Sequence, residues 1–137
     1  MSNQFESIEQ AIAVLEDVNQ DELVRNDAIR FLEESGSQEA IDALIRVLSD
    51  DDFGVRWAAA DALARLGAKA APAVLRVLIS PDSDDRLREA AHHIFKNNGD
   101  LVIRSEAQSL VKALESKSTN IDEMTEAAKL LAKLTTG

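Results

Sequence analysis

A pattern that recurs three times along the chain limits the possible folds more than any other feature. Three segments share the string Asp-x-x-(Val/Leu)-Arg, and their arginines are Arg25, Arg56 and Arg88. The spacing is therefore 31 and then 32 residues. The columns that keep the same spacing are Gly36, Gly67 and Gly99, Ala28, Ala59 and Ala91, and Leu32, Leu63 and Phe95. Three independent columns at one period indicate a true internal repeat.

Each repeat is predicted to form two helices. An Asp carboxylate suits the first position because it accepts free amide hydrogens of the first turn. Apolar residues then recur at helical spacing, and the Gly is expected to end the helix in a left-handed conformation. A second helix should follow after about two residues. Its expected apolar positions are Ala40, Ile41, Leu44, Val47 and Leu48, then Ala71, Val74, Leu75 and Leu78, then Val102, Ile103, Leu110, Val111 and Leu114.

Two flanking segments complete the expected architecture. Residues 4–17 and 120–134 each carry an apolar stripe opposite a polar face, as end caps of a stacked array should. The stripes are Phe5, Ile8, Ile12 and Leu15, and Ile121, Met124, Ala128, Leu131 and Leu134. Aromatic residues are only 4% and Gly and Pro are few, which disfavours a turn-rich β fold. We expect eight helices, no strands and one domain.

Within that single domain, 1–137, the boundaries follow from the repeat. We expect an N-terminal cap (1–19), three repeats (20–50, 51–82 and 83–118) and a C-terminal cap (119–137).

The period and the Asp…Val-Arg…Ala…Leu…Gly string together resemble the short HEAT-like repeats first described in phycobilisome lyase subunits. The best match is residues 52–67 followed by 70–78, and the resemblance covers about residues 20–116. It implies an all-α, right-handed α-solenoid of about three HEAT-like helix pairs. The first helices would lie on its convex side and the second helices on its concave, inner side.

The repeated acidic and basic residues form a ladder whose members are Asp21, Arg25, Asp52, Arg56, Asp84 and Arg88. The arginines could bind an acidic partner. Their strict recurrence, with an Asp four residues earlier, instead favours a structural role in which each Arg pairs with loop carboxylates and fixes the stacking of the repeats.

The polar faces of the second helices are the main candidates for binding a partner protein. They carry Gln38, Asp42 and Arg46, then Lys69, Ala73 and Arg76, then Arg104, Gln108 and Lys112. Residues 1–52 have 14 acidic and three basic residues, whereas residues 53–79 carry Asp61 as their one acid. A locally positive middle repeat could steer an acidic segment of the partner onto the inner face.

Trp57 is a second candidate for protein binding. It aligns with Asn26 and Glu89, positions expected to face outward on a first helix. An exposed Trp offers a large rigid contact area and is a typical binding hot spot.

Other functions are disfavoured by what the sequence lacks. It has no Cys, and its two histidines, His92 and His93, are adjacent and point about 100° apart on a helix, which does not suit one metal ion. No nucleophile elbow, phosphate loop or dinucleotide fingerprint is present. The net charge of −10 argues against binding nucleic acids or anionic membranes, and no apolar run is long enough to span a bilayer. We expect a cytoplasmic, non-enzymatic scaffold or adaptor that binds another protein and needs no cofactor.

Two alternatives remain. The family resemblance implies an accessory subunit for bilin attachment or phycobilisome handling. The stripe of residues 120–134 would also suit a weak homodimer, where the other expectation is a monomer.

Overall fold

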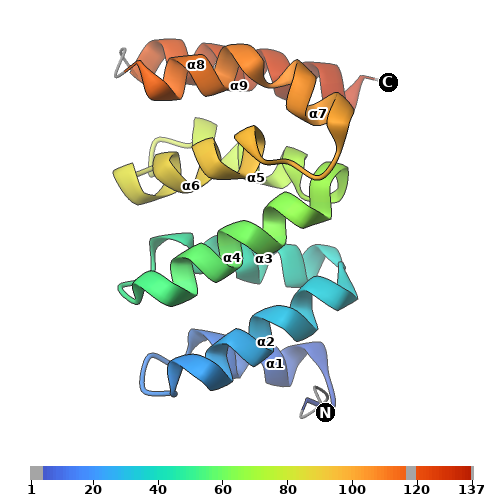
Figure 1. Cartoon of the computed structure of the whole chain (residues 1–137), viewed down its shortest axis with the longest axis vertical. Helices are drawn as coiled ribbons and strands as arrows, with labels where there is room; N and C mark the ends of the chain where they lie inside the picture. Colours follow the sequence, from blue (N-terminus) through green and yellow to red (C-terminus); the bar gives the residue numbers. More distant parts are fainter. Residues whose placement is uncertain (1–4, 117–119, 137) are drawn as a thin grey trace. The chain divides into compact units, whose positions relative to one another are not determined.

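The computed structural model describes residues 5–116 and 120–136, and these residues form α- and 3-10 helices joined by loops (Figure 1). The described part of the chain contains no strand, so the all-α prediction is confirmed. The predicted boundary between the third repeat and the C-terminal cap, at residues 118 and 119, lies outside the described residues. The handedness predicted for the solenoid stays a prediction.

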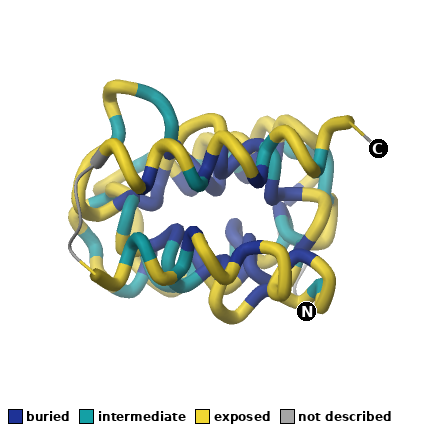
Figure 2. The backbone as a smooth tube through the Cα atoms, turned by 90° about the horizontal axis from the view of Figure 1, so that it is seen from above, coloured by how far each residue is buried: buried dark blue, intermediate teal, exposed yellow. Residues whose placement is uncertain are grey.

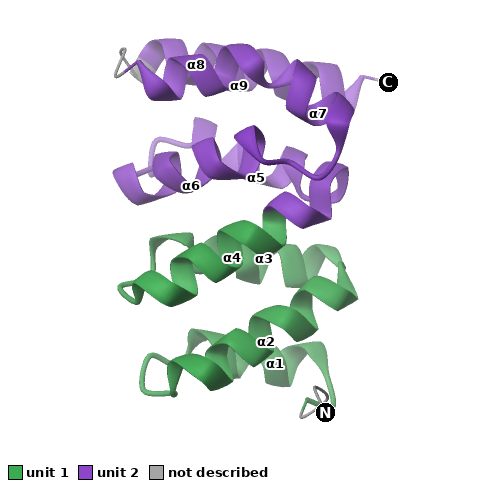
Figure 3. Ribbon diagram, viewed as in Figure 1, with its two compact units in different colours: residues 1–63 green, residues 64–137 purple. Residues whose placement is uncertain are grey.

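The chain divides into two compact units, residues 1–63 and residues 64–137 (Figure 3). Unit 1 contains α1 (Ile8–Glu16), α2 (Glu22–Ser35), α3 (Gln38–Arg46) with a 3-10 turn at Val47–Ser49, and most of α4 (Phe53–Leu66). Unit 2 contains the end of α4, a 3-10 turn at Gly67–Lys69, α5 (Ala71–Ile79), α6 (Asp85–Lys96), α7 (Leu101–Glu106), α8 (Gln108–Glu115) and α9 (Asn120–Thr135).

The acidic residues of the repeat string cap the first helices as predicted. The carboxylate of Asp21 accepts the Leu23 N–H at 2.9 Å, and that of Asp84 accepts the Leu87 N–H at 2.8 Å. Asp52 does the same for Val55 in the first turn of α4. Each cap satisfies an amide that would otherwise lack a partner and adds about 1 kcal/mol to helix stability.

The glycines end two of the three first helices. Gly36 and Gly67 have φ values of 61° and 60°, the left-handed conformation expected after a helix. The prediction is wrong for Gly99, because α6 already ends at Lys96 and Asn97 is its cap. Gly99 instead lets two backbone segments approach closely: its N–H donates to the Ala64 carbonyl at 2.8 Å, and an added Cβ would lie 3.3 Å from that oxygen.

The apolar faces of the first two repeats are buried as predicted, and buried stretches alternate with exposed ones along each helix (Figure 2). The five predicted positions of the second helix in repeat 1 and the four in repeat 2 are all buried. The third repeat follows the prediction only in part. Ile103 and Leu110 are buried, but Val102 is 67% exposed.

The C-terminal helix buries a different face from the one predicted. Glu123, Ala127 and Leu130 are buried, whereas Ile121 and Met124 are exposed. Each buried position lies one residue before a predicted one, which turns the helix by about 100°. The exposed residues Ile121 and Met124 belong to the stripe that was proposed to form a homodimer, and that homodimer stays a prediction.

Helix packing in unit 2 also departs from a regular array. α5 packs against α6 and α9, and α8 packs against the same two helices. In a regular solenoid the second helix of repeat 3, formed here by α7 and α8, would stack on α5. In unit 2 it is α9 that lies on α5, while α8 lies on α6.

Arg25 shows what the repeated arginine does in unit 1. It is 2% exposed, and its guanidinium binds both Asp50 carboxylate oxygens at 3.2 and 2.6 Å. Its Nε also donates to the Leu15 carbonyl at 2.9 Å, so one side chain joins the end of α1 to the loop before α4. Burial alone would raise the pKa of Asp50, but the bond from Arg25, the Asp52 N–H and the charges of Arg25 and Arg56 lower it below its ordinary value.

The other two arginines of the ladder have different partners. Arg56 donates to the Asp50 carbonyl at 2.8 Å. Arg88 pairs with Asp85 in its own helix and lies 3.6 Å from Glu123 in α9. Burial raises the pKa of Glu123, although the nearby Arg88 charge acts in the opposite direction. The arginines thus contact loops and neighbouring helices, while the carboxylates of the repeat string cap helices.

Candidate functional site

The residues predicted to share an inner face lie on helices of both units. Asp42 and Arg46 are exposed on α3, where Gln38 donates to Asp42 at 2.9 Å and Arg46 pairs with Glu16 of α1 at 2.6 Å. They belong to an open groove of about 430 Å³ between α1 and α3. Its lining residues are Glu9, Ile12, Ala13, Glu16, Glu39, Asp42 and Arg46. Four carboxylates against one guanidinium make this groove acidic.

The predicted positions on and before α5 divide into exposed and buried ones. Lys69 and Arg76 are exposed. Ala73 is only 8% exposed, so the prediction that it forms part of a binding surface is wrong. The apolar face of α5 is wider than the sequence pattern indicated, because α5 packs against both α6 and α9.

The structure brings the third group of predicted residues together in a second groove, between α6 and α8. This groove also measures about 430 Å³. Its lining residues are Lys96, Arg104, Gln108, Val111, Lys112 and Glu115. Sequence reasoning missed Lys96, which ends α6 and reaches this groove through the packing of α6 against α8. We call this set the basic groove.

Arg104 is held firmly at one end of the basic groove. Its Nε and one terminal nitrogen donate to the Asn98 carbonyl oxygen at 3.0 and 2.6 Å. Asn98 is itself buried, and its side chain amide donates to the Ile94 carbonyl at 3.3 Å. The guanidinium therefore has a fixed position while the residue as a whole stays exposed.

The single carboxylate of the basic groove is engaged by α6. Glu115 accepts the His92 Nε2 hydrogen at 2.8 Å and lies 3.6 Å from the Lys96 ammonium. The hydrogen bond from His92 and the charge of Lys96 lower the pKa of Glu115. Three cations against one paired carboxylate leave the groove positive.

The positive charge of the basic groove contrasts with the negative net charge of the chain as a whole. Residues 1–63 carry 15 acidic and four basic residues, whereas residues 64–137 carry 10 acidic and 11 basic residues. The whole negative charge of the chain therefore belongs to unit 1. The basic groove is a positive surface on a unit that is close to neutral.

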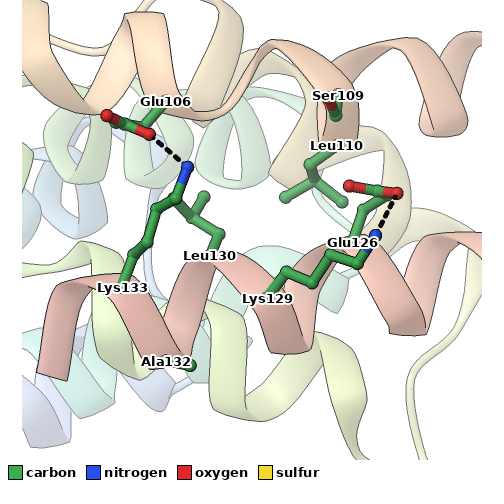
Figure 4. A pocket seen from close by; sticks show the side chains of 8 residues that line it. All are labelled: Glu106, Ser109, Leu110, Glu126, Lys129, Leu130, Ala132 and Lys133. Carbon is green, nitrogen blue, oxygen red and sulfur yellow. Dashed lines mark hydrogen bonds and ion pairs between the residues drawn. The ribbon is translucent and has the colours of Figure 1, made fainter. Parts of the chain in front are cut away.

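A third opening lies between α9 and the helices α7 and α8 (Figure 4). It measures about 500 Å³, and its charged residues pair with each other: Lys133 with Glu106 at 2.6 Å and Lys129 with Glu126 at 3.6 Å. Because these charges neutralise each other, one pair across the opening and the other along α9, we assign no ligand to it.

Both histidines have polar partners on neighbouring side chains. His92 binds Glu115, and His93 lies 3.4 Å from the Asn97 amide. Among the described residues, no three His, Asp or Glu side chains are grouped as metal ligands. None of the helices in that part of the chain combines the length and apolarity needed to cross a bilayer.

Trp57 is half-buried, so it faces outward only in part, and its role in protein binding stays a prediction. Its ring packs edge to face against Phe53, with the centroids 6.1 Å apart. Phe53 is the exposed member of the pair, at 68%. Sequence reasoning did not single it out, although it occupies a column whose other members are Glu22 and Asp85.

Helix pairs with a recurring capped string, and open grooves between their helices, define the class of α-helical repeat proteins. A sequence model of HEAT repeats matches residues 8–94, which is more than half of the chain. The chain therefore belongs to the HEAT repeat family. No curated protein matched the chain. The narrower resemblance to phycobilisome lyase repeats stays a prediction.

Membership of this family bears on function at a general level. HEAT repeats commonly serve as protein-interaction scaffolds, and the fold is generally non-enzymatic. Open grooves between helices suit this use because they offer side chains from two elements to one partner segment.

Proposed function

We propose that the chain is a non-enzymatic scaffold or adaptor that binds an acidic segment of a partner protein in the basic groove. The observation that carries this proposal is the convergence of Lys96, Arg104 and Lys112 from three helices onto one groove. Val111 lines the same groove, so a bound segment would pair its carboxylates with the cations and place an apolar side chain against Val111.

The fixed position of Arg104 supports this proposal. A guanidinium already held by the Asn98 carbonyl loses little conformational entropy when it also binds a carboxylate. Lys96 and Lys112 would add charge that speeds the encounter with an acidic segment and lowers the affinity as salt is raised.

The test is a titration with a short labelled peptide of Glu and Leu, followed by fluorescence anisotropy. The double variant Lys96→Glu with Lys112→Glu should weaken binding by about tenfold or more, because like charges would face the peptide. The matched control is Lys69→Glu with Arg76→Glu, which makes the same change in net charge on exposed residues outside the groove. The control should keep most of the affinity.

Two outcomes would refute the proposal that the acidic peptide binds in the basic groove. Equal losses in both double variants would show that net charge alone governs binding. A larger loss in the control would move the site to Lys69 and Arg76, as the sequence suggested. Helical circular dichroism of each variant checks that the fold is kept.

The alternative role in handling a bilin gains no support from the described grooves. A bilin site needs an enclosed, mostly apolar pocket with a few placed polar groups. The basic groove, the acidic groove on α1 and α3, and the opening between α9 and the helices α7 and α8 are all open, and at least half of the residues that line each are charged.

A further inference from the structure

The first turns of α2 and α4 carry an exposed apolar surface in unit 1. The carboxylate of Glu22 lies where a side chain on Gly54 would begin, so these two turns are direct neighbours. Leu23, in the first turn of α2, is 72% exposed, and Phe53, in the first turn of α4, is 68% exposed. We call Leu23, Phe53, Arg56 and Trp57 the aromatic patch.

The ring of Phe53 is held in a fixed position although most of it faces solvent. Trp57 packs edge to face against it at 6.1 Å and an interplanar angle of 62°. The Arg56 guanidinium lies 5.5 Å from the ring centroid, and its own hydrogen bond to the Asp50 carbonyl keeps it there. A rigid, exposed aromatic side chain loses little entropy on contact and is a typical centre of a binding interface.

The chemistry around the patch selects a cationic partner. Asp21 and Glu22 begin α2, and Asp51 and Asp52 come directly before Phe53 in the sequence. The unit as a whole has 15 acidic residues against four basic ones. Arg56 already lies at cation–π distance from the Phe53 ring, within about 6 Å, so the cations of a partner would pair with these carboxylates.

From this arrangement we infer that the aromatic patch binds a basic, amphipathic segment of a protein partner. Its apolar side chains would contact Phe53 and Leu23, and its Lys or Arg side chains would pair with the surrounding carboxylates. This site is separate from the basic groove in its unit, its charge and its chemistry. The chain would then be an adaptor that takes an acidic segment on unit 2 and a basic segment on unit 1.

Trp57 allows a direct test, because it is the one Trp of the chain and Tyr is absent. A labelled peptide of Lys and Leu with amphipathic helical spacing is titrated and followed by anisotropy. The emission of Trp57 is recorded in parallel with unlabelled peptide. We expect saturable binding together with a shift in Trp57 emission. The counterpart peptide in which Glu replaces every Lys should leave the Trp57 emission unchanged, because its expected site is the basic groove.

Substitutions locate the site. Phe53→Ala should weaken binding of the Lys–Leu peptide by about tenfold, the loss typical of an interface hot spot. Leu101→Ala is the matched control, since Leu101 is an apolar residue of unit 2 with 71% exposure, and it should leave the affinity unchanged. If Phe53→Ala disturbs the helical circular dichroism, Leu23→Ser gives a second reading with an expected loss of several-fold.

The inference is overturned if Phe53→Ala or Leu23→Ser binds the Lys–Leu peptide like the unchanged chain. It is also overturned if the peptide binds without any change in Trp57 emission, because binding would then be diffuse attraction to the acidic unit. The variant Lys96→Glu with Lys112→Glu must keep the affinity for the Lys–Leu peptide. This result separates failure here from failure of the basic groove, which is tested with the Glu–Leu peptide.

Discussion

Arg25→Ala should be the most damaging substitution of a charged residue in the ladder. The change removes three hydrogen bonds: two to the Asp50 carboxylate and one to the Leu15 carbonyl. Both charged side chains are nearly excluded from water, with 3% and 11% exposure, so the partners left behind cannot regain full hydration. Breaking a buried pair from one side costs about 3–5 kcal/mol.

For a chain of this length, such a loss corresponds to roughly 10–20 °C in Tm. Urea unfolding followed by helical circular dichroism measures the free energy, and a thermal scan measures the Tm. The control is Arg30→Ala on the same helix, because Arg30 forms an exposed pair with Asp27 at 3.1 Å. An exposed pair of this kind contributes about 0–1 kcal/mol. If the two variants differ by less than about 1 kcal/mol, the ladder arginine does not hold the helices together.

The pH dependence of the free energy of unfolding gives a second check. The pKa of Asp50 is lowered in the folded chain, so its contribution to stability is fully present above the ordinary carboxyl pKa. That contribution disappears as the pH falls through the lowered pKa. Arg25→Ala removes the main partner of the carboxylate, so the variant should lose less stability than the unchanged chain over this acidic range. Parallel acid profiles would contradict the assignment.

Three further predictions concern single residues. Glu123→Gln should raise the free energy of unfolding at neutral pH, because burial raises the pKa of Glu123 and its charged form is unfavourable in the folded chain. The gain should vanish below the ordinary carboxyl pKa, and urea titrations at two pH values measure it. Gly99→Ala should lower stability by about 1–3 kcal/mol, since the new Cβ meets backbone oxygens at 3.3 Å. Gly54→Ala should be nearly neutral in the same assay, because its Cβ meets only the flexible end of a glutamate side chain. Arg56→Ala should lower the Tm more than Arg76→Ala, because Arg56 is half-buried and bonded to the Asp50 carbonyl while Arg76 is exposed; equal changes would count against a structural role for Arg56.

The features that could be predicted from the sequence are those that depend on residues close to one another along the chain. The caps at Asp21, Asp52 and Asp84, and the left-handed ends at Gly36 and Gly67, depend on contacts within one or two helical turns. The buried stripes of the first two repeats were also predictable, because apolar and polar residues there are well separated around the helix.

The candidate site was predictable only in part. Arg104, Gln108 and Lys112 were assigned to a binding surface from their polar positions, and the basic groove contains all three. Their expected neighbours on α5 were not brought to them, because α8 packs on α6 and α9. Lys96 joined the groove because of that packing, which no pattern within a single helix encodes.

The sequence alone determined that this chain is an array of capped helix pairs of the HEAT type, since each pair is specified by local periodicity and caps. Only the tertiary structure decided how the last helices pack and which side chains stay exposed. In α9, apolar residues stand side by side at Ala127 and Ala128 and at Leu130 and Leu131, so over these turns two faces about 100° apart are both apolar. The face of Ala127 and Leu130 is the buried one, because α9 packs against α5 and α8 on that side. The exposure of Phe53 beside Trp57 is likewise a result of tertiary packing, since it depends on whether another part of the chain covers the first turn of α4.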